Sequence, residues 1–507
     1  MTAAVQPANM GHMGVYPYTH VVPRKAAAVV IVSYRNGLEV LLAQRNRSLE
    51  FMAGHHVFPG GALDDEDSPD HVDGTADDGH ARYVFAAARE VFEETGLLLA
   101  DGPPPPWGAL REARRDLYAG TRDFAQILDD FSMRLCTSDF TPAGIWITPA
   151  FSPKRFHTQY LLYRYEGERY QEVFEPDGEI VGLEWFDPGE ARRQWQLDGI
   201  RLSTPVAFVL RHLTAFPLDQ ALPLLQHTPG RDPDVPNRFE PRRGINIIPV
   251  RTATLPPATH TNCVVVGEEE LLVVDPGAAD AEEQEHLVGL GEHLVQFGGR
   301  LTGIVLTHGH GDHTSAAVRL REVFGTPIMA HAEVDAPFEI DQRLGDGEVL
   351  SVAGDPPWRL RCVYTPGHAP GHLSLFEEST RILLCGDLVA NPGTIMIAPD
   401  YGGDMTQYLE SLERLLELDY VLIVPSHGIP VWGSAGKELV QHLIAHRLER
   451  EGKIKAALDA GAETVQAVLE RAYDDVPREA WPLAEQQLRA HLARLGMRIE
   501  NDRVTWR

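Results

Sequence analysis

The chain has 507 residues, which is too long for one hydrophobic core and suggests about three domains. Hydrophobic residues make up 43% and charged residues 23% of it, as in ordinary globular proteins. The formal net charge of −28 argues against broad non-specific binding to nucleic acid or to an anionic membrane, because both require clustered Lys and Arg. This net charge does not exclude a local basic groove, and it is compatible with a protein that binds divalent cations.

The four cysteines indicate buried, reduced thiols and no disulfide framework. None forms a CxxC pair, and three lie within the apolar runs TNCVVV, LRCVYT and ILLCGD. Together with the absence of a signal-peptide pattern at the N-terminus, this favours a reducing compartment. Because no apolar run approaches the ~20 residues that span a bilayer, we expect a cytoplasmic protein without a membrane segment.

The first part of the chain predicts a flexible tail over 1–21 and a mixed α/β domain over 22–224. AAAVVIVSY, the polar RNG and LEVLLAQR predict a β-hairpin. The acidic, turn-rich stretch 64–80 predicts a loop, and ARYVFAAAREVFEET predicts a helix that stops at Gly96. Further strands are expected at GIWITPAF, TQYLLYRYE and EIVGLEWF, and a closing helix at TPVAFVLRHLTAF.

A carboxylate cluster lies on the predicted helix that ends at Gly96. Glu90, Glu93 and Glu94 stand at positions i, i+3 and i+4, so they share one helical face. Three like charges on one face repel each other unless a cation is bound, and Mg²⁺ prefers such oxygen ligands. On this pattern alone, the alternative is a solvated acidic face.

The segment RExxEExG, preceded by HVFPGG, resembles the Nudix box. Gly61 matches its first glycine, and Asp67 stands in for its early acid, although the run from Asp67 to Arg89 is longer than usual. VLLAQRNRSLEFMAGHHVFPGG, WITPAFSPKRFHT and EIVGLEWFDPGEA are similar to the peroxisomal-type coenzyme A diphosphatase branch. The peroxisomal location does not carry over, since the chain ends in VTWR.

This resemblance covers about residues 22–220 and implies a Nudix α/β/α sandwich that cleaves a nucleoside diphosphate linkage. It implies Mg²⁺ or Mn²⁺ held by Glu90, Glu93 and Glu94, with Glu93 and Glu94 taking part in catalysis. Arg89 is expected to anchor the preceding loop by ion pairing. The candidates for binding substrate phosphate are Arg45 and Arg155.

Residues 225–244 are rich in Pro, Arg and Asp and are interpreted as an interdomain linker. Short apolar runs follow over 245–445, and several end in side chains that bind metals. Because the carboxyl ends of adjacent strands share one edge of an α/β sheet, we expect these side chains to converge there. They are His308 after IVLT, His368 after VYTPG, Asp387 after LLCG and His427 after LIVPS.

The turn THGHGDH adds His310, Asp312 and His313 to this set. His308 and His310 are two residues apart, so both can face one ion, while Asp312 and His313 can face a second. Imidazole and carboxylate ligands suit zinc, or iron or manganese. A lone histidine is more often a packed or surface residue than a ligand, but the ordered set of HxHxDH, TPGH, GD and SHG indicates a metal site.

This ordered set resembles the metallo-β-lactamase fold superfamily over about residues 245–445. The resemblance implies an αββα sandwich with two zinc ions, one held by His308, His310 and His368. The other ion would be held by Asp312, His313 and His427, with Asp387 bridging and Asp312 also catalytic. Asp275 in LVVDPG matches a motif residue that supports the site. Such an ion pair activates water to attack an ester, thioester or phosphodiester.

The last part of the chain, 446–507, is charged and rich in predicted helix, and MRIENDRVTWR is a possible hairpin. A small helical domain of winged-helix type is expected. YLESLERLLEL, VPSHGIPV and AHRLERE resemble the β-lactamase-like single-strand endoribonucleases more than the glyoxalase II thioesterases, which share the core motifs. A lactam-cleaving role is not expected, since that class is normally exported.

Three functional hypotheses follow. The chain is a bifunctional hydrolase of coenzyme A compounds, in which one half splits the diphosphate and the other the thioester. Alternatively, it processes single-stranded RNA, although the charge of −28 counts against this. In the third hypothesis, one half is a degenerate binding or regulatory module, and the interrupted Nudix box makes it the N-terminal half. The expected partner is a small nucleotide or thioester or single-stranded RNA, with no membrane, and the oligomeric state is left open.

Overall fold

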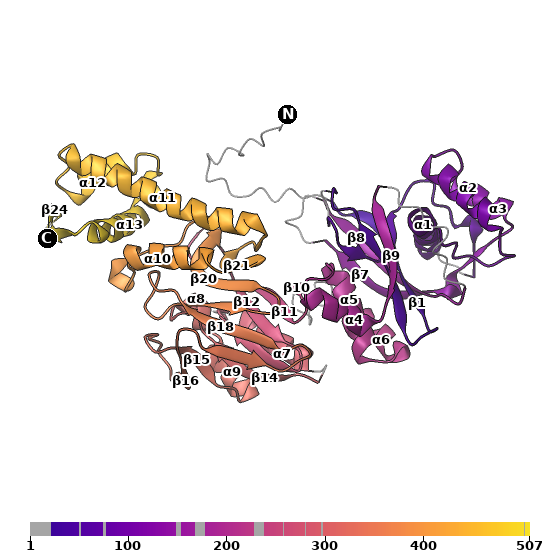
Figure 1. Cartoon of the computed structure of the whole chain (residues 1–507), viewed down its shortest axis with the longest axis horizontal. Helices are drawn as coiled ribbons and strands as arrows, with labels where there is room; N and C mark the ends of the chain where they lie inside the picture. The colour runs from indigo at the N-terminus through magenta and orange to yellow at the C-terminus, as the bar shows by residue number, and fades with distance from the viewer. Residues whose placement is uncertain are drawn as a thin grey trace.

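The computed structural model forms three units along the chain (Figure 1). The residues that it describes are 22–49, 52–74, 78–148, 154–167, 178–227, 238–256, 258–278, 280–295, 298–500 and 502–506. The predicted tail, 1–21, and most of the predicted linker lie outside the described residues. The linker prediction overlaps one regular element, because strand β10 begins at Phe239.

The N-terminal unit is built on a seven-stranded mixed sheet. Its strand order is β3-β2-β1-β8-β7, with β4 paired to β1 and β9 paired to β2. β1 runs parallel to β8 and antiparallel to β2, so the predicted hairpin is confirmed. The strands are β1 (Arg24–Ser33), β2 (Glu39–Arg45), β3 (His56–Val57), β4 (Gly60–Ala62), β7 (Phe140–Ile147), β8 (Phe156–Arg164) and β9 (Ile180–Phe186).

Helices cover both faces of this sheet, which explains why β1 is apolar at nearly every position. Ala27, Val29 and Ile31 pack in a core with the first three helices. The alternate residues of β1 pack on the other face with the last three helices. The unit is therefore an α/β/α sandwich. Its helices are α1 (Asp78–Thr95), α2 (Trp107–Tyr118), α3 (Phe124–Asp130), α4 (Pro188–Gln196), α5 (Thr204–Ala215) and α6 (Leu218–Leu225).

The prediction that 64–80 is a loop is only partly right. A short 3-10 helix (Pro69–His71) and strand β5 (Val72–Asp73) lie within it, and β5 pairs with β6 (Leu135–Cys136). Asp67 is only 3% exposed. This stretch folds onto the body of the unit because buried hydrogen bonds hold it there, a constraint that composition alone does not reveal.

The central unit contains two sheets packed face to face. The first has the order β10-β11-β12-β13-β14-β15-β16 and the second the order β17-β18-β19-β20-β21-β22. The first sheet comprises β10 (Phe239–Arg242), β11 (Ile245–Arg251), β12 (His260–Gly267), β13 (Glu270–Val274), β14 (Arg300–Val305), β15 (Ile328–His331) and β16 (Gln342–Leu344). The second comprises β17 (Val349–Val352), β18 (Trp358–Tyr364), β19 (Leu373–Glu377), β20 (Ile382–Asn391), β21 (Leu422–Gly428) and β22 (Val431–Trp432).

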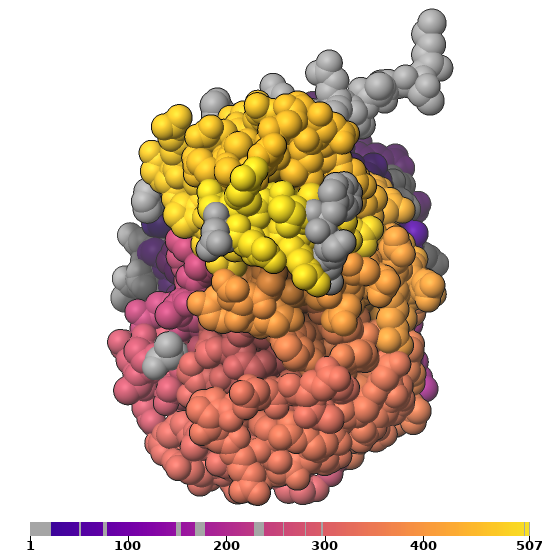
Figure 2. Space-filling model, turned by 90° about the vertical axis from the view of Figure 1, so that its left-hand side faces the viewer, coloured from indigo at the N-terminus to yellow at the C-terminus, as the bar shows by residue number. Residues whose placement is uncertain are grey.

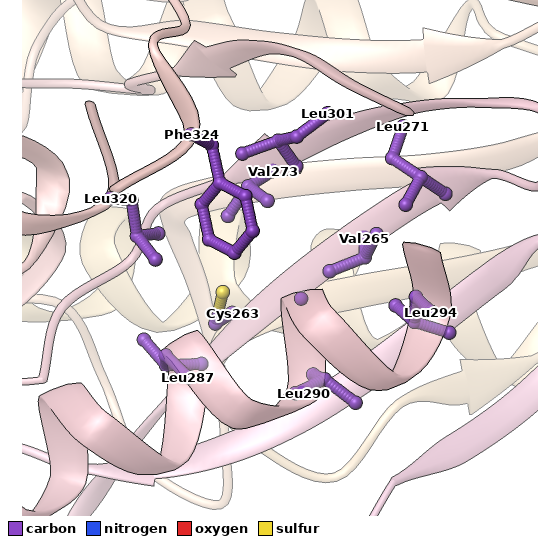
Figure 3. Close-up of a pocket in the computed structure, with 11 residues that line it drawn as sticks. Cys263, Val265, Leu271, Val273, Leu287, Leu290, Leu294, Leu301, Leu320 and Phe324 are labelled. Atoms are coloured by element: carbon purple, nitrogen blue, oxygen red, sulfur yellow. The ribbon is translucent and has the colours of Figure 1, made fainter. Parts of the chain in front are cut away.

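A shared core lies between the two sheets, with Trp358 fully buried in it. The outer face of the first sheet packs against α7 (Ala281–Val295) and α9 (Ala317–Phe324). The outer face of the second packs against α10 (Met405–Leu416) and α11 (Ser434–Asp459). This four-layer arrangement confirms the predicted αββα sandwich. A small apolar cavity of about 10 Å³ lies between the first sheet, α7 and α9. Figure 3 shows the side chains that line it.

The C-terminal unit continues from α11, which runs without a break across the predicted domain boundary at 445/446. α12 (Val465–Ala472) and α13 (Trp481–Arg494) pack against it around a separate core. β23 (Met497–Glu500) and β24 (Arg503–Trp506) form the predicted hairpin. Among the described helices, none has the length and apolar character needed to cross a membrane.

The N-terminal and central units meet along α4. Trp195 Nε1 donates to Pro241 O at 3.1 Å, and Gln196 Nε2 donates to Pro356 O at 3.0 Å. Arg192, 4% exposed, forms an ion pair with Glu268 of the central unit. These buried polar contacts fix α4 against the first sheet, because breaking them would leave buried groups unpaired.

Candidate functional site

Each predicted metal-binding side chain of the central unit lies on a loop, on a strand or in the short helix α8 at one end of the sandwich. His308 and His310 occupy the turn between β14 and α8 (Gly311–Thr314), which itself contains Asp312 and His313. His368 follows β18, whereas Asp387 and His427 lie within β20 and β21. The expectation of a single sheet edge is wrong, since β14 belongs to the first sheet and the other three strands to the second. The side chains converge because packing the sheets face to face brings both edges together.

Three imidazoles meet where the edges of the two sheets come together. His368 Nε2 and His308 Nε2 each lie 3.0 Å from His310 Nδ1. His308 is fully buried and His368 is 7% exposed. This is the group that the sequence assigned to the first ion.

A second group lies beside the first, and Asp387 stands between them. Asp312 Oδ2 is 3.5 Å from His427 Nε2, and Asp312 Oδ1 is 3.9 Å from His313 Nε2. Asp387 Oδ1 lies 3.4 Å from His427 Nε2 and 3.5 Å from His313 Nε2, while its Oδ2 lies 3.5 Å from His368 Nε2. Asp387 therefore has the position expected of a bridging ligand.

The donor set fits two divalent cations. His313 Nε2 and Asp387 Oδ1 are buried and make no hydrogen bond within the described structure. Such buried polar atoms are costly unless something satisfies them. In the described part of the chain, the sets of three or more possible ligand atoms within 4.8 Å of one another all belong to this cluster.

Burial keeps most of the imidazoles neutral, as metal ligands must be. It lowers the pKa of His308 well below its usual value and that of His310 to about 4. His313 differs: burial opposes its protonation, but the carboxylates of Asp387 and Asp275 outweigh this and raise its pKa. The pKa of His427 is likewise raised, because the nearby Asp387 carboxylate outweighs the effect of burial.

A second layer of hydrogen bonds orients the rings. His368 Nδ1 donates to Met396 O at 2.8 Å, and His427 Nδ1 donates to His260 O at 3.0 Å. His313 Nδ1 donates to Asp275 Oδ2 at 2.9 Å. Each bond fixes the tautomer whose Nε2 faces the cluster. Asp275 is itself held by Thr307, whose backbone N–H and hydroxyl both donate to its carboxylate at 2.7 Å.

Sequence reasoning missed His372. This fully buried histidine accepts a hydrogen bond from the backbone N–H of Asp387 at 3.0 Å through Nε2, so its Nδ1–H donates to Thr365 Oγ1. Gly386 makes room for it, because a Cβ there would lie 2.3 Å from His372 Nε2. The signal was present as a second GH three residues after TPGH, in the string TPGHAPGH.

The three glutamates lie together on α1 in the N-terminal unit. The backbone N–H of Gly60 donates to Glu94 Oε2 at 3.0 Å, and a Cβ on Gly61 would collide with Glu90. Burial raises the pKa of Glu90 to about 7 and that of Glu94 well above its usual value. The glutamates do not form one of the tight ligand sets described above.

Arg89 makes the loop-anchoring ion pair that the sequence predicts. Its Nε donates to Asp67 Oδ1 at 2.8 Å and its Nη2 to Asp67 Oδ2 at 3.2 Å, and Nη2 also donates to Ala62 O. Asp67, which stands in the position of the early acid of the Nudix box, therefore contacts Arg89 despite the long stretch of chain between them. A buried bidentate pair of this kind fixes α1 against the segment that carries Gly60 and Gly61.

Of the two candidate phosphate-binding arginines, one lies near the glutamates. Arg45, at the end of β2, pairs with Glu179 at 2.8 Å and is close enough to Glu94 to lower the pKa of that carboxyl slightly against the effect of burial. Arg155 Nε donates to Thr148 O at 2.9 Å, across the turn between β7 and β8. The structure therefore associates Arg45 with the glutamate cluster, and Arg155 with a turn.

Comparison with known proteins identifies the second and third units. Residues 256–427 match the Metallo-beta-lactamase superfamily, and residues 464–498 match the Beta-lactamase associated winged helix domain. An uncharacterised protein of Aquifex aeolicus is 31% identical over 193 residues, covering 34% of this chain and 82% of that protein. The Atrochrysone carboxyl ACP thioesterase of Aspergillus fumigatus is 27% identical over 261 residues, covering 48% and 76%.

Two solved structures are also similar to parts of this chain. A metallo-beta-lactamase family protein from Thermus thermophilus is 24% identical, with a TM-score of 0.42, covering 52% of this chain and 99% of that one. A NUDIX hydrolase from Alicyclobacillus acidocaldarius is 26% identical, with a TM-score of 0.36, covering 41% and 98%.

Proposed function

The chain belongs to the metallo-beta-lactamase superfamily through residues 256–427, and we propose that it is a two-metal hydrolase that cleaves an ester or thioester. The observation that carries this proposal is the convergence of five imidazoles and two carboxylates at one end of the sandwich. His308, His310 and His368 would hold one ion, Asp312, His313 and His427 the other, and Asp387 would lie between them. Zinc suits this donor set, and iron or manganese are alternatives.

Two cations held there would lower the pKa of a water molecule and would neutralise the charge that develops on the carbonyl oxygen of the substrate. The protein supplies neutral imidazoles, because burial lowers the pKa of His308, His310 and His368. Asp312, with 17% of its side chain exposed, is the most accessible carboxylate of the cluster. It is therefore placed to accept a proton from the attacking water and pass it to the leaving group.

Two observations favour an acyl substrate. One relative is named as an acyl-carrier-protein thioesterase. In addition, exposed apolar side chains flank the ligands in sequence: Leu255, 50% exposed, follows Thr254, whose Oγ1 lies 3.4 Å from His427 Nε2. Ile429, 48% exposed, lies two residues after His427. Apolar surface of this kind suits an acyl chain better than a phosphodiester backbone, which attracts Lys and Arg.

The test is hydrolysis of acetyl- and longer-chain acyl-coenzyme A, followed by thiol release, with zinc-loaded protein. His310→Ala should lower the rate by more than the ~10–100-fold typical of an outer-shell change. His286→Ala is the matched control, because His286 is half exposed on α7, away from the cluster. Equal rates in His310→Ala and wild type, or no thiol release by wild type with any acyl chain, would refute the thioesterase proposal.

The alternative function is cleavage of single-stranded RNA, favoured by the winged-helix match over 464–498. Winged-helix and related helix-turn-helix units commonly bind nucleic acid. The same His310→Ala and His286→Ala pair applies, with a labelled single-stranded RNA as substrate. RNA cleavage that disappears only in His310→Ala, without acyl-coenzyme A hydrolysis, would favour this alternative.

For the N-terminal unit, we propose a Nudix diphosphatase that uses Mg²⁺ or Mn²⁺. Support comes from the shared helical face of Glu90, Glu93 and Glu94 and from the Arg89–Asp67 pair that fixes this helix. Glu90 and Glu94 lie in surroundings that disfavour charged carboxylates, and a bound cation would reverse that preference. Together the two units would dismantle coenzyme A compounds in the cytoplasm.

Mass spectrometry of products from acetyl-coenzyme A and Mg²⁺ tests this second site. Phosphopantetheine-type fragments should form with wild type and with Glu112→Gln, a surface carboxylate on α2, but not with Glu94→Gln. Fragments that persist in Glu94→Gln would refute the assignment. If wild type produces none, the third hypothesis, a binding or regulatory N-terminal unit, is favoured.

A further inference from the structure

One ligand of the candidate metal centre depends on an irregular segment for its orientation. His368 Nδ1 donates to Met396 O at 2.8 Å, and Met396 lies between β20 and the 3-10 helix Pro399–Tyr401. No strand or helix includes the described residues 392–398. The carbonyl that orients His368 is therefore not held by a backbone ladder, and something else must fix it.

The C-terminal unit and the middle of α11 supply that constraint. Ile395 O, one residue before Met396, accepts hydrogen bonds from Arg447 Nη2 at 2.5 Å and from Gln487 Nε2 at 2.9 Å. Arg447 Nη2 also donates to Thr394 Oγ1 at 2.6 Å, and Arg447 Nη1 donates to Gln487 Oε1 at 3.1 Å. Arg447 lies on α11, and Gln487 lies on α13.

These contacts are buried and mutually dependent. Arg447 is 3% exposed and Gln487 is 8% exposed. A buried guanidinium is costly unless its N–H groups are satisfied, so Arg447, Gln487 and the Ile395 carbonyl form one connected network. Because its donor is charged, the bond from Arg447 to Ile395 O is stronger than an ordinary backbone hydrogen bond.

The same arginine reaches the bridging ligand by a second path. Its guanidinium carbon lies 5.4 Å from the centroid of the Tyr408 ring, and Tyr408 Oη donates to Leu388 O at 2.8 Å. Leu388 directly follows Asp387. Figure 2 shows the C-terminal residues, in yellow, resting directly on the orange part of the central unit.

We propose that Arg447 and Gln487 are positioning residues for the metal centre, which hold 394–396 so that Met396 O orients His368. The inference rests on the proposed two-metal site. It gives the C-terminal winged-helix unit a role in assembling the metal centre, independent of any nucleic acid. Removing either side chain leaves the Ile395 carbonyl with one of its two side-chain donors. The segment 394–396 is then held less firmly and the His368 ring can turn, so binding of the ion held by His308, His310 and His368 is weakened selectively.

The experiment measures zinc affinity by competition with a chromophoric chelator, together with zinc content per chain, in the full-length protein. Gln487→Leu and Arg447→Met are compared with wild type, with Arg447→Lys as a conservative rescue. Arg489→Met is the matched control, because its guanidinium pairs with Glu485 on α13 itself. Thermal unfolding of each metal-free variant measures stability independently.

We expect the affinity for one of the two ions to fall ~10–100-fold in Gln487→Leu and Arg447→Met, the size typical of outer-shell changes. The other ion should bind as in wild type, Arg447→Lys should recover part of the loss, and Arg489→Met should behave as wild type. Cobalt-substituted protein should show an altered visible spectrum in Gln487→Leu and Arg447→Met, a smaller change in Arg447→Lys and no change in Arg489→Met.

Three results would overturn the inference. If both ions bind Gln487→Leu and Arg447→Met as tightly as wild type, the contacts do not position His368. If both ions weaken in parallel with a fall in metal-free stability, the contacts merely stabilise the fold. Wild-type protein that retains no divalent ion would instead refute the proposed two-metal function, and this inference with it.

Discussion

Asp275→Asn probes the carboxylate beneath the metal centre while leaving the shape of the side chain almost unchanged. Asp275 is 2% exposed and accepts hydrogen bonds from Thr307 N–H, from the Thr307 hydroxyl and from His313 Nδ1–H. An asparagine can keep the bond from Thr307 N–H, and its amide can donate to the Thr307 hydroxyl. The amide then meets the Nδ1–H of His313 donor to donor, and that bond is lost.

The lost bond involves a charged group, so the metal-free protein should be destabilised by roughly 1.5–3 kcal/mol. The His313 ring also loses the partner that fixes its tautomer. The ion held by Asp312, His313 and His427 should therefore bind ~10–100-fold more weakly.

Urea unfolding of the metal-free protein and chelator competition measure these two effects. Asp280→Asn is the matched control, because Asp280 is an exposed residue that accepts from Glu283 N–H at the start of α7, and asparagine caps a helix equally well. A stability change within about ±0.5 kcal/mol, as for ordinary surface substitutions, together with unchanged zinc affinity would refute the supporting role of Asp275.

The remaining predictions concern pH, charge and packing. Burial lowers the pKa of His372 to about 3, so its contribution to stability is present above the unfolded value near 6.5 and is lost as the pH falls towards 3. Between pH 7.5 and pH 5, the free energy of unfolding of metal-free His372→Gln should therefore fall by about 2 kcal/mol less than that of wild type, as measured by urea unfolding. An identical fall in both proteins would contradict the burial argument. Glu94→Gln should unfold at the same or a higher urea concentration at pH 8, because burial already disfavours its charged form, and a clear loss of stability would contradict this. Leu290→Ala enlarges the cavity in Figure 3 and should cost ~2–5 kcal/mol, whereas a cost below about 1 kcal/mol would mean that the site collapses around the lost side chain.

The sequence predicts the parts of the metal centre that depend on local order. The turn His308–His313 places four side chains within six residues, and any turn at that point brings them close together. The apolar runs before His368, Asp387 and His427 correctly predict strands. Their meeting point was predicted at one sheet edge, whereas it lies where two sheets meet, because periodicity shows which residues are buried and not which sheet a strand joins.

The features that the sequence did not predict depend on contacts between distant segments of the chain. Arg447 and Gln487 support the centre through the Ile395 carbonyl, and a side chain that binds a distant carbonyl leaves no pattern in the sequence. His372 supports it through the backbone N–H of Asp387, and only the repeated GH in TPGHAPGH pointed to it. Likewise, the buried ion pair between Asp67 and Arg89 joins residues 22 positions apart, and Asp67 lies in the stretch 64–80, whose composition predicts a loop. Strand β10 is a further example. Its Pro- and Arg-rich sequence is typical of a linker, and it forms a strand because it pairs with β11.

The central claim is that seven side chains of the sandwich hold two divalent ions. Native mass spectrometry of the full-length protein, purified with zinc and freed of loosely bound metal, tests it most directly. The account predicts two ions per wild-type chain and a loss of both from Asp387→Ala at matched chelator concentration, because this carboxylate lies between the two groups. A wild-type chain without bound ions, or an Asp387→Ala chain that retains both, would contradict it.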